Sequence, residues 1–182
     1  MSLLITICLL HFIAQLSPGP DVLLVAKSAA SNSRANTLKI VLGISVGIVV
    51  WVVLTLLGFT VLIEQWPWIQ QALMLIGGFF LAKIGYGMLK GGLVSLKQQA
   101  SLDGVMEQKP QNYFMLGLFT NLSNPKTLIY FSSVFSLALS SSAGASLKPQ
   151  LAVIIPIQTF VVFSLLTLIM SMPKMKAMYQ QA

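Results

Sequence analysis

Charged residues are scarce in this sequence, and their scarcity excludes most classes of protein. Only 8% of the 182 residues are charged and four are acidic, whereas 56% are hydrophobic. Soluble domains carry about 25% charged residues, so a water-soluble globule is excluded. Disordered chains combine low hydrophobicity with high charge, which is the opposite composition. The class that remains is an integral membrane protein in contact with the lipid bilayer.

Cysteine and histidine each occur once, as Cys8 and His11. A single cysteine allows no disulfide framework, no redox pair and no thiolate metal site, and Cys8 is expected to be a small buried hydrophobe. His11 has no second imidazole to share a metal with, so we expect a core role or a role as a proton carrier. Three of the four acids, Glu64, Asp103 and Glu107, fall in predicted loops. The sequence therefore predicts no metal site, no cofactor and no enzymatic activity.

Long apolar runs predict the membrane spans, because a helix crossing about 30 Å of hydrocarbon needs about 20 apolar residues. Five segments satisfy this requirement, namely 3–30, 41–63, 68–89, 113–139 and 151–172. Two of them are interrupted, the first by Ser17-Pro18-Gly19-Pro20-Asp21 and the fourth by Asn124-Pro125-Lys126. We therefore predict an all-α, polytopic membrane helix bundle, a single membrane domain over 1–182 with five transmembrane helices, of which helices one and four are broken.

Basic residues fall almost entirely on one side of the predicted spans. The segments after spans one, three and five hold Lys27, Arg34, Lys39, Lys90, Lys97, Lys109, Lys174 and Lys176. The segments on the other side hold only Lys148. By the positive-inside rule the N-terminus is outside, and loops 27–39 and 90–112 and the tail 173–182 are cytoplasmic. The net charge of +7 thus reflects orientation, and no nucleic-acid partner is expected.

Each interrupted span is expected to contain two half-helices. Proline removes a backbone hydrogen bond and moves the preceding residue out of the α region. Asn124 is a preferred N-cap and Pro125 suits the first position of a helix, so a half-helix should begin there. Such an N-terminus attracts anions, for example a carboxylate. Both breaks lie at a similar predicted depth, and we expect them to line one pocket, as discontinuous helices do in many secondary transporters.

Asp21 and Lys126 directly follow prolines of the two breaks and are the only charges there. An ionised side chain near the bilayer centre costs at least about 2.5–3.5 kcal/mol, so each needs a partner or a polar cavity. One interpretation is a mutual ion pair that stabilises the fold. The other is direct contact with a substrate or a coupling proton, and the two are compatible. A zwitterionic amino acid suits the pair, because its carboxylate can meet Lys126 and its ammonium Asp21.

The spacing of small residues and of the breaks gives two further predictions. The pairs Gly43 and Gly47, and Gly87 and Gly91, have the separation that lets membrane helices approach closely. Both broken spans begin a group of helices, in opposite orientations, as inverted-repeat transporters require. We predict a first three-helix repeat over 1–89, a cytoplasmic loop over 90–112 and an incomplete second repeat over 113–182.

Two motifs resemble a known family. Residues 11–21, from His11 to Asp21, are similar to the first-helix motif of the LysE-type amino-acid exporter superfamily, in its homoserine and threonine efflux branch. Residues 117–126 and 129–136 are similar to the fourth-helix motif, and 42–45, 50–51, 62–64 and 85–90 also resemble this branch.

The resemblance implies a bacterial inner-membrane exporter of threonine, homoserine or similar small amino acids, driven by protons. We expect the substrate to be bound by Ser17, Pro18, Gly19, Pro20, Asp21, Asn121, Asn124, Pro125 and Lys126. The family pattern has six helices in a 3+3 inverted repeat, whereas five spans are predicted here. Three explanations stay open: the chain is truncated, a second copy in a homodimer fills the gap, or the protein is an inactive or structural fragment.

Overall fold

The computed structural model describes residues 3–69, 112–135 and 147–175, together with 71, 72, 75, 76, 79, 82, 83 and 86. Within these residues the chain forms helices and no strand, which confirms the predicted all-α class. The helices are α1 (Leu3–Leu16), α2 (Pro20–Ser31), α3 (Arg34–Leu56), α4 (Phe59–Gln65), α6 (Tyr113–Leu122), α7 (Pro125–Ile129), the π-helix η1 (Tyr130–Phe135) and α9 (Leu147–Met170).

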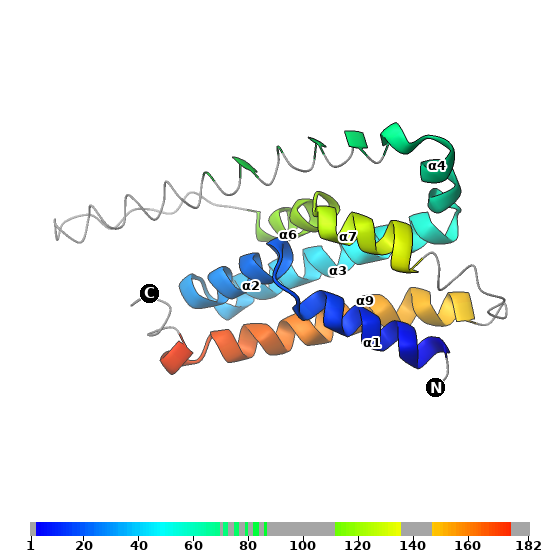
Figure 1. Ribbon diagram of the computed structural model, residues 1–182. Coiled ribbons are helices and arrows are strands. Elements are labelled where there is room, and N and C mark those ends of the chain that lie inside the picture. Colours follow the sequence, from blue (N-terminus) through cyan, green and yellow to red (C-terminus); the bar gives the residue numbers. More distant parts are fainter. Residues whose placement is uncertain are drawn as a thin grey trace.

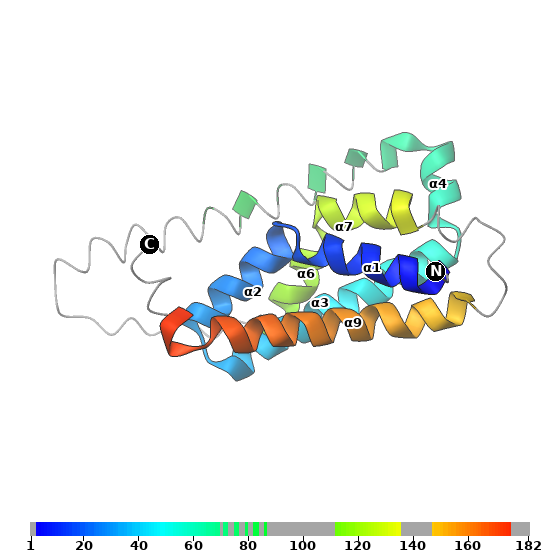
Figure 2. The same cartoon turned by 60° about the horizontal axis from the view of Figure 1, so that its bottom comes forward.

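Helix α3 is the centre of the bundle. It packs most extensively against α6 and then against α9, and α9 in turn contacts α1 and α2 (Figures 1 and 2). The beginning of α1, the end of α3 and the beginning of α9 lie at one end of the bundle (Figure 1). The connection between α2 and α3, the beginning of α6 and the end of α9 lie at the other end. Helices α1, α2 and α9 therefore run in one direction, and α3, α6 and α7 run in the opposite direction (Figure 1).

Two described helices, α3 and α9, are long and apolar enough to cross a membrane, and α1 with α2 gives a third if the bent pair counts as one span. Helix α6 is apolar but shorter. Large apolar side chains face outward, with Ile13, Leu23 and Val153 about 60% exposed, as suits contact with lipid. Most of predicted span three, Gly87 with Gly91, and the loop 90–112 apart from its last residue lie outside the described residues.

The predicted boundaries of the second span were wrong at both ends. The prediction was 41–63, whereas α3 covers Arg34–Leu56. It begins early because the Ser33 side chain caps it, accepting a hydrogen bond from the Asn36 N–H at 3.3 Å. It ends early because Gly58 adopts the left-handed conformation, with φ of 92°. The predicted loop 27–39 is therefore mostly helical, and only residues 32 and 33 connect α2 to α3.

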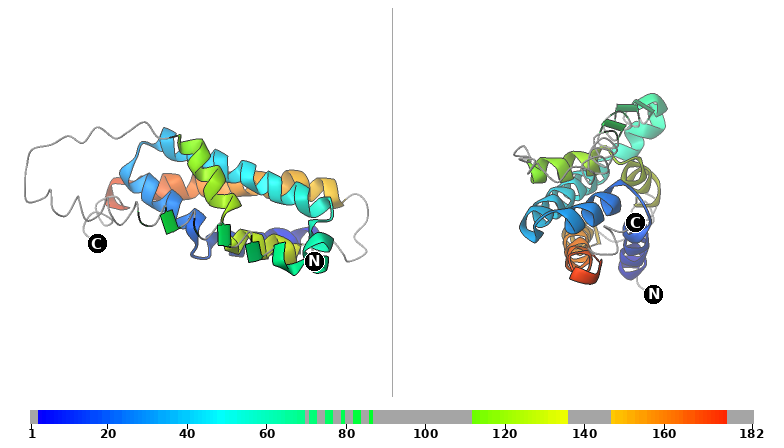
Figure 3. Two further views of the ribbon diagram at one scale, coloured as in Figure 1. Left: turned by 90° about the horizontal axis from the view of Figure 1, so that it is seen from above. Right: turned by 90° about the vertical axis from the view of Figure 1, so that its left-hand side faces the viewer.

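Glycines bring α3 and α6 together almost backbone to backbone, as predicted for Gly43 and Gly47. A Cβ atom added at Gly43 would overlap the carbonyl oxygen of Phe114, and one at Gly117 would overlap that of Ile40. A Cβ atom at Gly47 would press on the side chain of Asn121. Figure 3 shows α6 crossing α3 at this contact. The contact holds α6, and with it Asn121, in place beside α3.

Replacing Gly117 with alanine is expected to destabilise the protein by about 1–3 kcal/mol, because the added methyl group overlaps backbone that cannot move without separating the two helices. Thermal unfolding of the purified protein in detergent measures the effect. The matched control is Ala35→Ser, which adds one heavy atom at an exposed position of α3. Equal unfolding temperatures for the two variants would contradict this account of the contact.

The buried apolar side chains form two clusters. One joins α1, α7, η1, the second half of α3 and the beginning of α9, and contains Ile7, Ile48, Trp51, Val52, Leu128, Tyr130, Phe131, Leu151 and Ile155. The other joins α2, the first half of α3 and the later part of α9, and contains Leu24, Val25, Ile40, Val41, Ile44 and Phe163. Helix α1 thus belongs to the first cluster and α2 to the second, so the first break lies where the chain passes from one cluster to the other.

Candidate functional site

The first break separates α1 from α2 and bends the chain by 58°. The last backbone bond of α1 runs from the Ser17 N–H to the carbonyl of Ile13, at 3.1 Å. Gly19 is extended, and Pro20 is the first residue of α2, where its missing N–H costs no hydrogen bond. Asp21 follows in the first turn of α2, where the helix dipole favours its negative charge.

The second break separates α6 from α7. The side chain of Asn124 accepts a hydrogen bond from the Lys126 N–H at 3.0 Å, and Pro125 is the first residue of α7. The predicted N-cap and the new helical start are thus confirmed. From Tyr130 to Phe135 the helix widens to a π-helix, which the sequence did not predict. Single π-turns are frequent at functional sites.

Hydrogen bonds join the two breaks. The amide of Asn121 in α6 donates to Asp21 Oδ2 at 2.8 Å, and both side chains are buried. The ammonium group of Lys126 donates to the backbone carbonyl of Ser17. Residues from the two predicted motifs, about a hundred positions apart in the chain, are therefore in direct contact.

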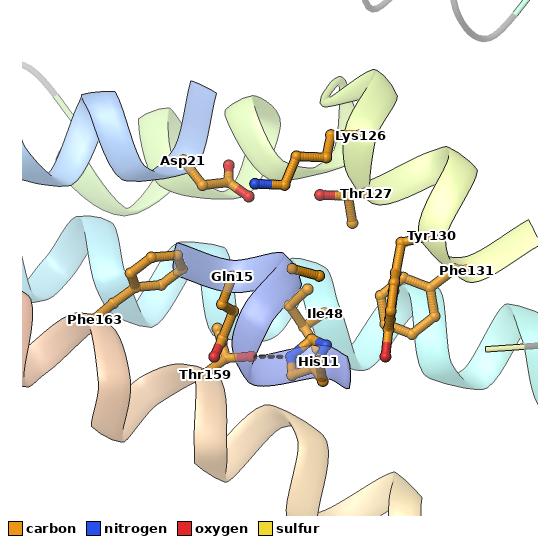
Figure 4. Close-up of a pocket in the computed structure, with 11 residues that line it drawn as sticks. His11, Gln15, Asp21, Ile48, Lys126, Thr127, Tyr130, Phe131, Thr159 and Phe163 are labelled. Atoms are coloured by element: carbon orange, nitrogen blue, oxygen red, sulfur yellow. Dashed lines mark hydrogen bonds between the residues drawn. The ribbon is translucent and has the colours of Figure 1, made fainter. Parts of the chain in front are cut away.

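Asp21 and Lys126 do not pair directly with each other among the described residues. The Lys126 side chain extends toward Asp21 in Figure 4, but its ammonium bonds to the Ser17 carbonyl, while Asp21 bonds to Asn121. Each charge thus lies at a helix end that the first break creates: the carboxylate at the positive start of α2, the ammonium at the negative end of α1. This placement explains how two charges are tolerated inside an apolar bundle.

The remaining predicted residues shape the backbone of the breaks. Pro18, Pro20 and Pro125 supply turns without an N–H group to satisfy. A Cβ atom added at Gly19 would lie 3.2 Å from both Cδ and Nζ of Lys126, so glycine leaves room for the lysine to cross the break.

A small cavity of about 30 Å³ lies beside the two breaks. Helices α1, α2, α3, α7, η1 and α9 all contribute to its walls, which are formed by His11, Ala14, Gln15, Asp21, Ile48, Lys126, Thr127, Tyr130, Phe131, Thr159 and Phe163. In Figure 4, Asp21, Lys126 and Thr127 lie on one side of it, and His11, Gln15 and Thr159 on the other. Its volume is about that of one water molecule, so the walls must move apart before the cavity can hold an amino acid.

Several polar atoms around this cavity are buried without a hydrogen-bond partner. They are Oδ1 of Asp21, both amide atoms of Gln15, and Nδ1 of His11. Buried polar groups in proteins are normally hydrogen-bonded, so unpartnered ones that gather around a cavity need an explanation. Together they offer both acceptors and donors to a small polar molecule.

Of the nine residues predicted for substrate binding, Asp21 and Lys126 line the cavity. Asn121 does not line it, but its side chain donates a hydrogen bond to Asp21. Prediction from the sequence missed Gln15, Thr127, Tyr130 and Thr159 as part of the same cavity. Gln15 carried a detectable signal, because it lies one helical turn after His11 in an otherwise apolar run. Thr159 carried none, since its helix is far away in the chain.

Comparison with known proteins adds an independent result. A family model described as LysE type translocator matches residues 12–182. Threonine efflux proteins of Salmonella typhimurium and Escherichia coli K12 are 38% and 36% identical over 181 residues, covering 100% of this chain and 88% of each relative. An uncharacterized membrane protein of Haemophilus influenzae is 34% identical, covering 98% of this chain and 86% of its own. No solved structure matches the chain.

Proposed function

The chain belongs to the LysE type translocator family, and from this premise we propose that it exports threonine, homoserine or a similar small neutral amino acid from the cytoplasm in exchange for protons. The observation that carries the proposal is the meeting of two broken helices at a cavity that presents one carboxylate and one ammonium group. The threonine efflux proteins among the relatives support the substrate class.

The two charged groups of the cavity offer a partner for each end of an amino acid. Asp21 uses Oδ2 for Asn121 and keeps Oδ1 for the ammonium group of the substrate. Lys126 is the partner of the substrate carboxylate, in a charge-assisted hydrogen bond. Thr127, Thr159 and Gln15 offer hydrogen bonds to a hydroxyl group on the substrate side chain.

The charges around the cavity also favour a neutral side chain. Asp21 and Lys126 are the only carboxylate and ammonium groups that line it among the described residues. Both are used by the two ends of the substrate. A lysine or glutamate substrate would therefore bury a third charge without a partner, which is costly.

Substrate binding provides a reason for the broken helices to move. The substrate carboxylate competes with the Ser17 carbonyl for the ammonium group of Lys126, so binding releases the contact that joins α7 to the first break. The chain on both sides of Gly19 is then free to change its angle, as alternating access requires.

We place the beginning of α1 outside and the connection between α2 and α3 in the cytoplasm of a bacterium, with the bundle in the inner membrane.

Efflux from bacterial cells tests the proposal. Cells expressing the chain and loaded with labelled threonine are expected to lose the label faster than cells with an empty vector, and an uncoupler should slow this loss. Loaded homoserine should be exported in the same way, and lysine and glutamate should not. Equal rates with and without the protein, for every neutral amino acid tested and with the protein present in the membrane, would refute the proposal.

A further inference from the structure

His11 is held in the cavity wall in one orientation. It is 3% exposed, and its Nε2 lies 3.0 Å from Oγ1 of Thr159 in α9. The rings of Tyr130 and Phe131 lie against the imidazole, with ring centroids 5.3 and 6.4 Å away. The side chain is therefore fixed by a polar contact on one edge and by aromatic packing beside it.

The hydrogen bonds of Thr159 determine which nitrogen of His11 carries the proton. The Thr159 hydroxyl donates its single proton to the backbone carbonyl of Ile155, at 3.0 Å. A hydroxyl that donates there accepts from His11, and on this ground we assign the proton of the neutral imidazole to Nε2. The lone pair is then on Nδ1, which is buried and has no hydrogen-bond partner.

We propose that this Nδ1 lone pair is the coupling site of the exporter: it accepts either the coupling proton or an N–H of the substrate ammonium group, and never both. The inference rests on the proposed function, and it names the residue that makes export and proton entry mutually dependent. From the outside, a proton adds to Nδ1, gives the imidazolium and displaces the substrate. From the cytoplasmic side, the substrate ammonium takes the lone pair and the proton leaves to water.

The groups that face His11 are compatible with this exchange. From the other elements of the cavity these are Ile48 of α3, Asp21 of α2, Lys126 and Thr127 of α7, Tyr130 and Phe131 of η1, and Thr159 of α9. Its own helix contributes Gln15 to the cavity wall, and Cys8 lies about one turn before His11 in the same helix. Asp21 attracts an imidazolium and Lys126 repels it, so the two charges oppose each other. Competition for one lone pair, and not the net charge of the cavity, then couples proton and substrate.

The protein contains a single histidine, so its imidazole can be observed without interference once any affinity tag is removed. In wild-type protein labelled with ¹⁵N-histidine, nitrogen chemical shifts should show the Nε2–H tautomer near neutral pH. Threonine at about ten times its dissociation constant should move the titration of His11 about one pH unit toward acid, as exclusive binding requires, and lysine should not move it. An Nδ1–H tautomer would overturn the inference, and so would a titration that threonine leaves unchanged.

Transport by reconstituted vesicles separates failure of the inference from failure of the proposed function. Counterflow of labelled threonine without a pH gradient measures transport alone, and its absence in the wild type refutes the proposed function. With vesicles one pH unit more acidic inside, the wild type should accumulate threonine up to about tenfold for one proton exchanged per molecule.

His11→Gln keeps a donor toward Thr159 but cannot take up a proton. It is expected to lower counterflow, because the substrate ammonium group loses one acceptor, and to abolish the accumulation entirely. Accumulation equal to wild type would overturn the coupling role. Counterflow equal to wild type would overturn the other half of the inference, because the Nδ1 lone pair would then not bind the substrate.

Discussion

Replacing Asp21 with asparagine is expected to lower threonine counterflow by about two orders of magnitude or more. Asparagine has the same shape and can keep the contact with Asn121, but it removes the negative charge that faces the substrate ammonium group. Removing one partner of a buried charge pair costs about 3–5 kcal/mol, which corresponds to a factor of roughly one hundred to several thousand.

Labelled-threonine counterflow in vesicles measures this loss against a matched control. Glu64→Gln makes the same chemical change at an exposed position of α4, and it should transport like the wild type. The yield of protein extracted from the membrane should be the same for both variants. If Asp21→Asn kept half or more of the wild-type flux, Asp21 would not bind the substrate.

Replacing Lys126 with methionine is expected to reduce counterflow by a similar factor and to destabilise the protein as well. Methionine preserves much of the length of the side chain, but it offers no donor to the substrate carboxylate or to the Ser17 carbonyl. A hydrogen bond to a charged group contributes about 1.5–3 kcal/mol, so the unfolding temperature should fall together with transport.

Lys148→Met is the control for this variant, because Lys148 is exposed at the beginning of α9. It should change neither transport nor the unfolding temperature. Lys126→Met with an unchanged unfolding temperature would show that the bond to the Ser17 carbonyl does not stabilise the first break. Wild-type counterflow in the same variant would remove Lys126 from the substrate site.

The two breaks use opposite charges for a physical reason. Both begin a half-helix with proline followed by a charged residue, Asp21 in α2 and Lys126 in α7. A carboxylate is stabilised at the start of its own helix, whereas an ammonium group is not. Lys126 therefore reaches away from its own helix to the carbonyl end of α1. Because of this asymmetry, the wall of one cavity carries both a positive and a negative group. A zwitterionic substrate needs one partner of each sign.

The features that could be predicted from sequence are local ones. Prolines and rare charges identified the two breaks, and the polar pattern predicted an N-cap at Asn124, because each of these depends on neighbouring residues only. The ends of α3 were wrong because Ser33 and Gly58, and not the apolar run, determine them. Helix ends are determined by single capping residues, and a prediction based on the length of an apolar run does not take these residues into account.

The walls of the cavity could not be predicted, for a different reason. Thr159 approaches His11 from a helix almost 150 positions away in the chain. Tyr130 lines the cavity from the start of a π-helix, which the apolar pattern of the sequence does not indicate. Such contacts depend on how the helices pack. In a sequence that is apolar on all helix faces, the spacing of the residues gives little indication of which faces pack together.

Binding of substrate fragments to the two charge variants tests the central claim most directly. The claim is that Lys126 binds the carboxylate and Asp21 the ammonium group of one amino acid. In equilibrium binding to purified protein, the wild type should prefer threonine about tenfold or more over its methyl ester and over the hydroxy acid that lacks the ammonium group. Lys126→Met should lose only the preference over the ester, and Asp21→Asn only the preference over the hydroxy acid. Both preferences unchanged in both variants would contradict the account.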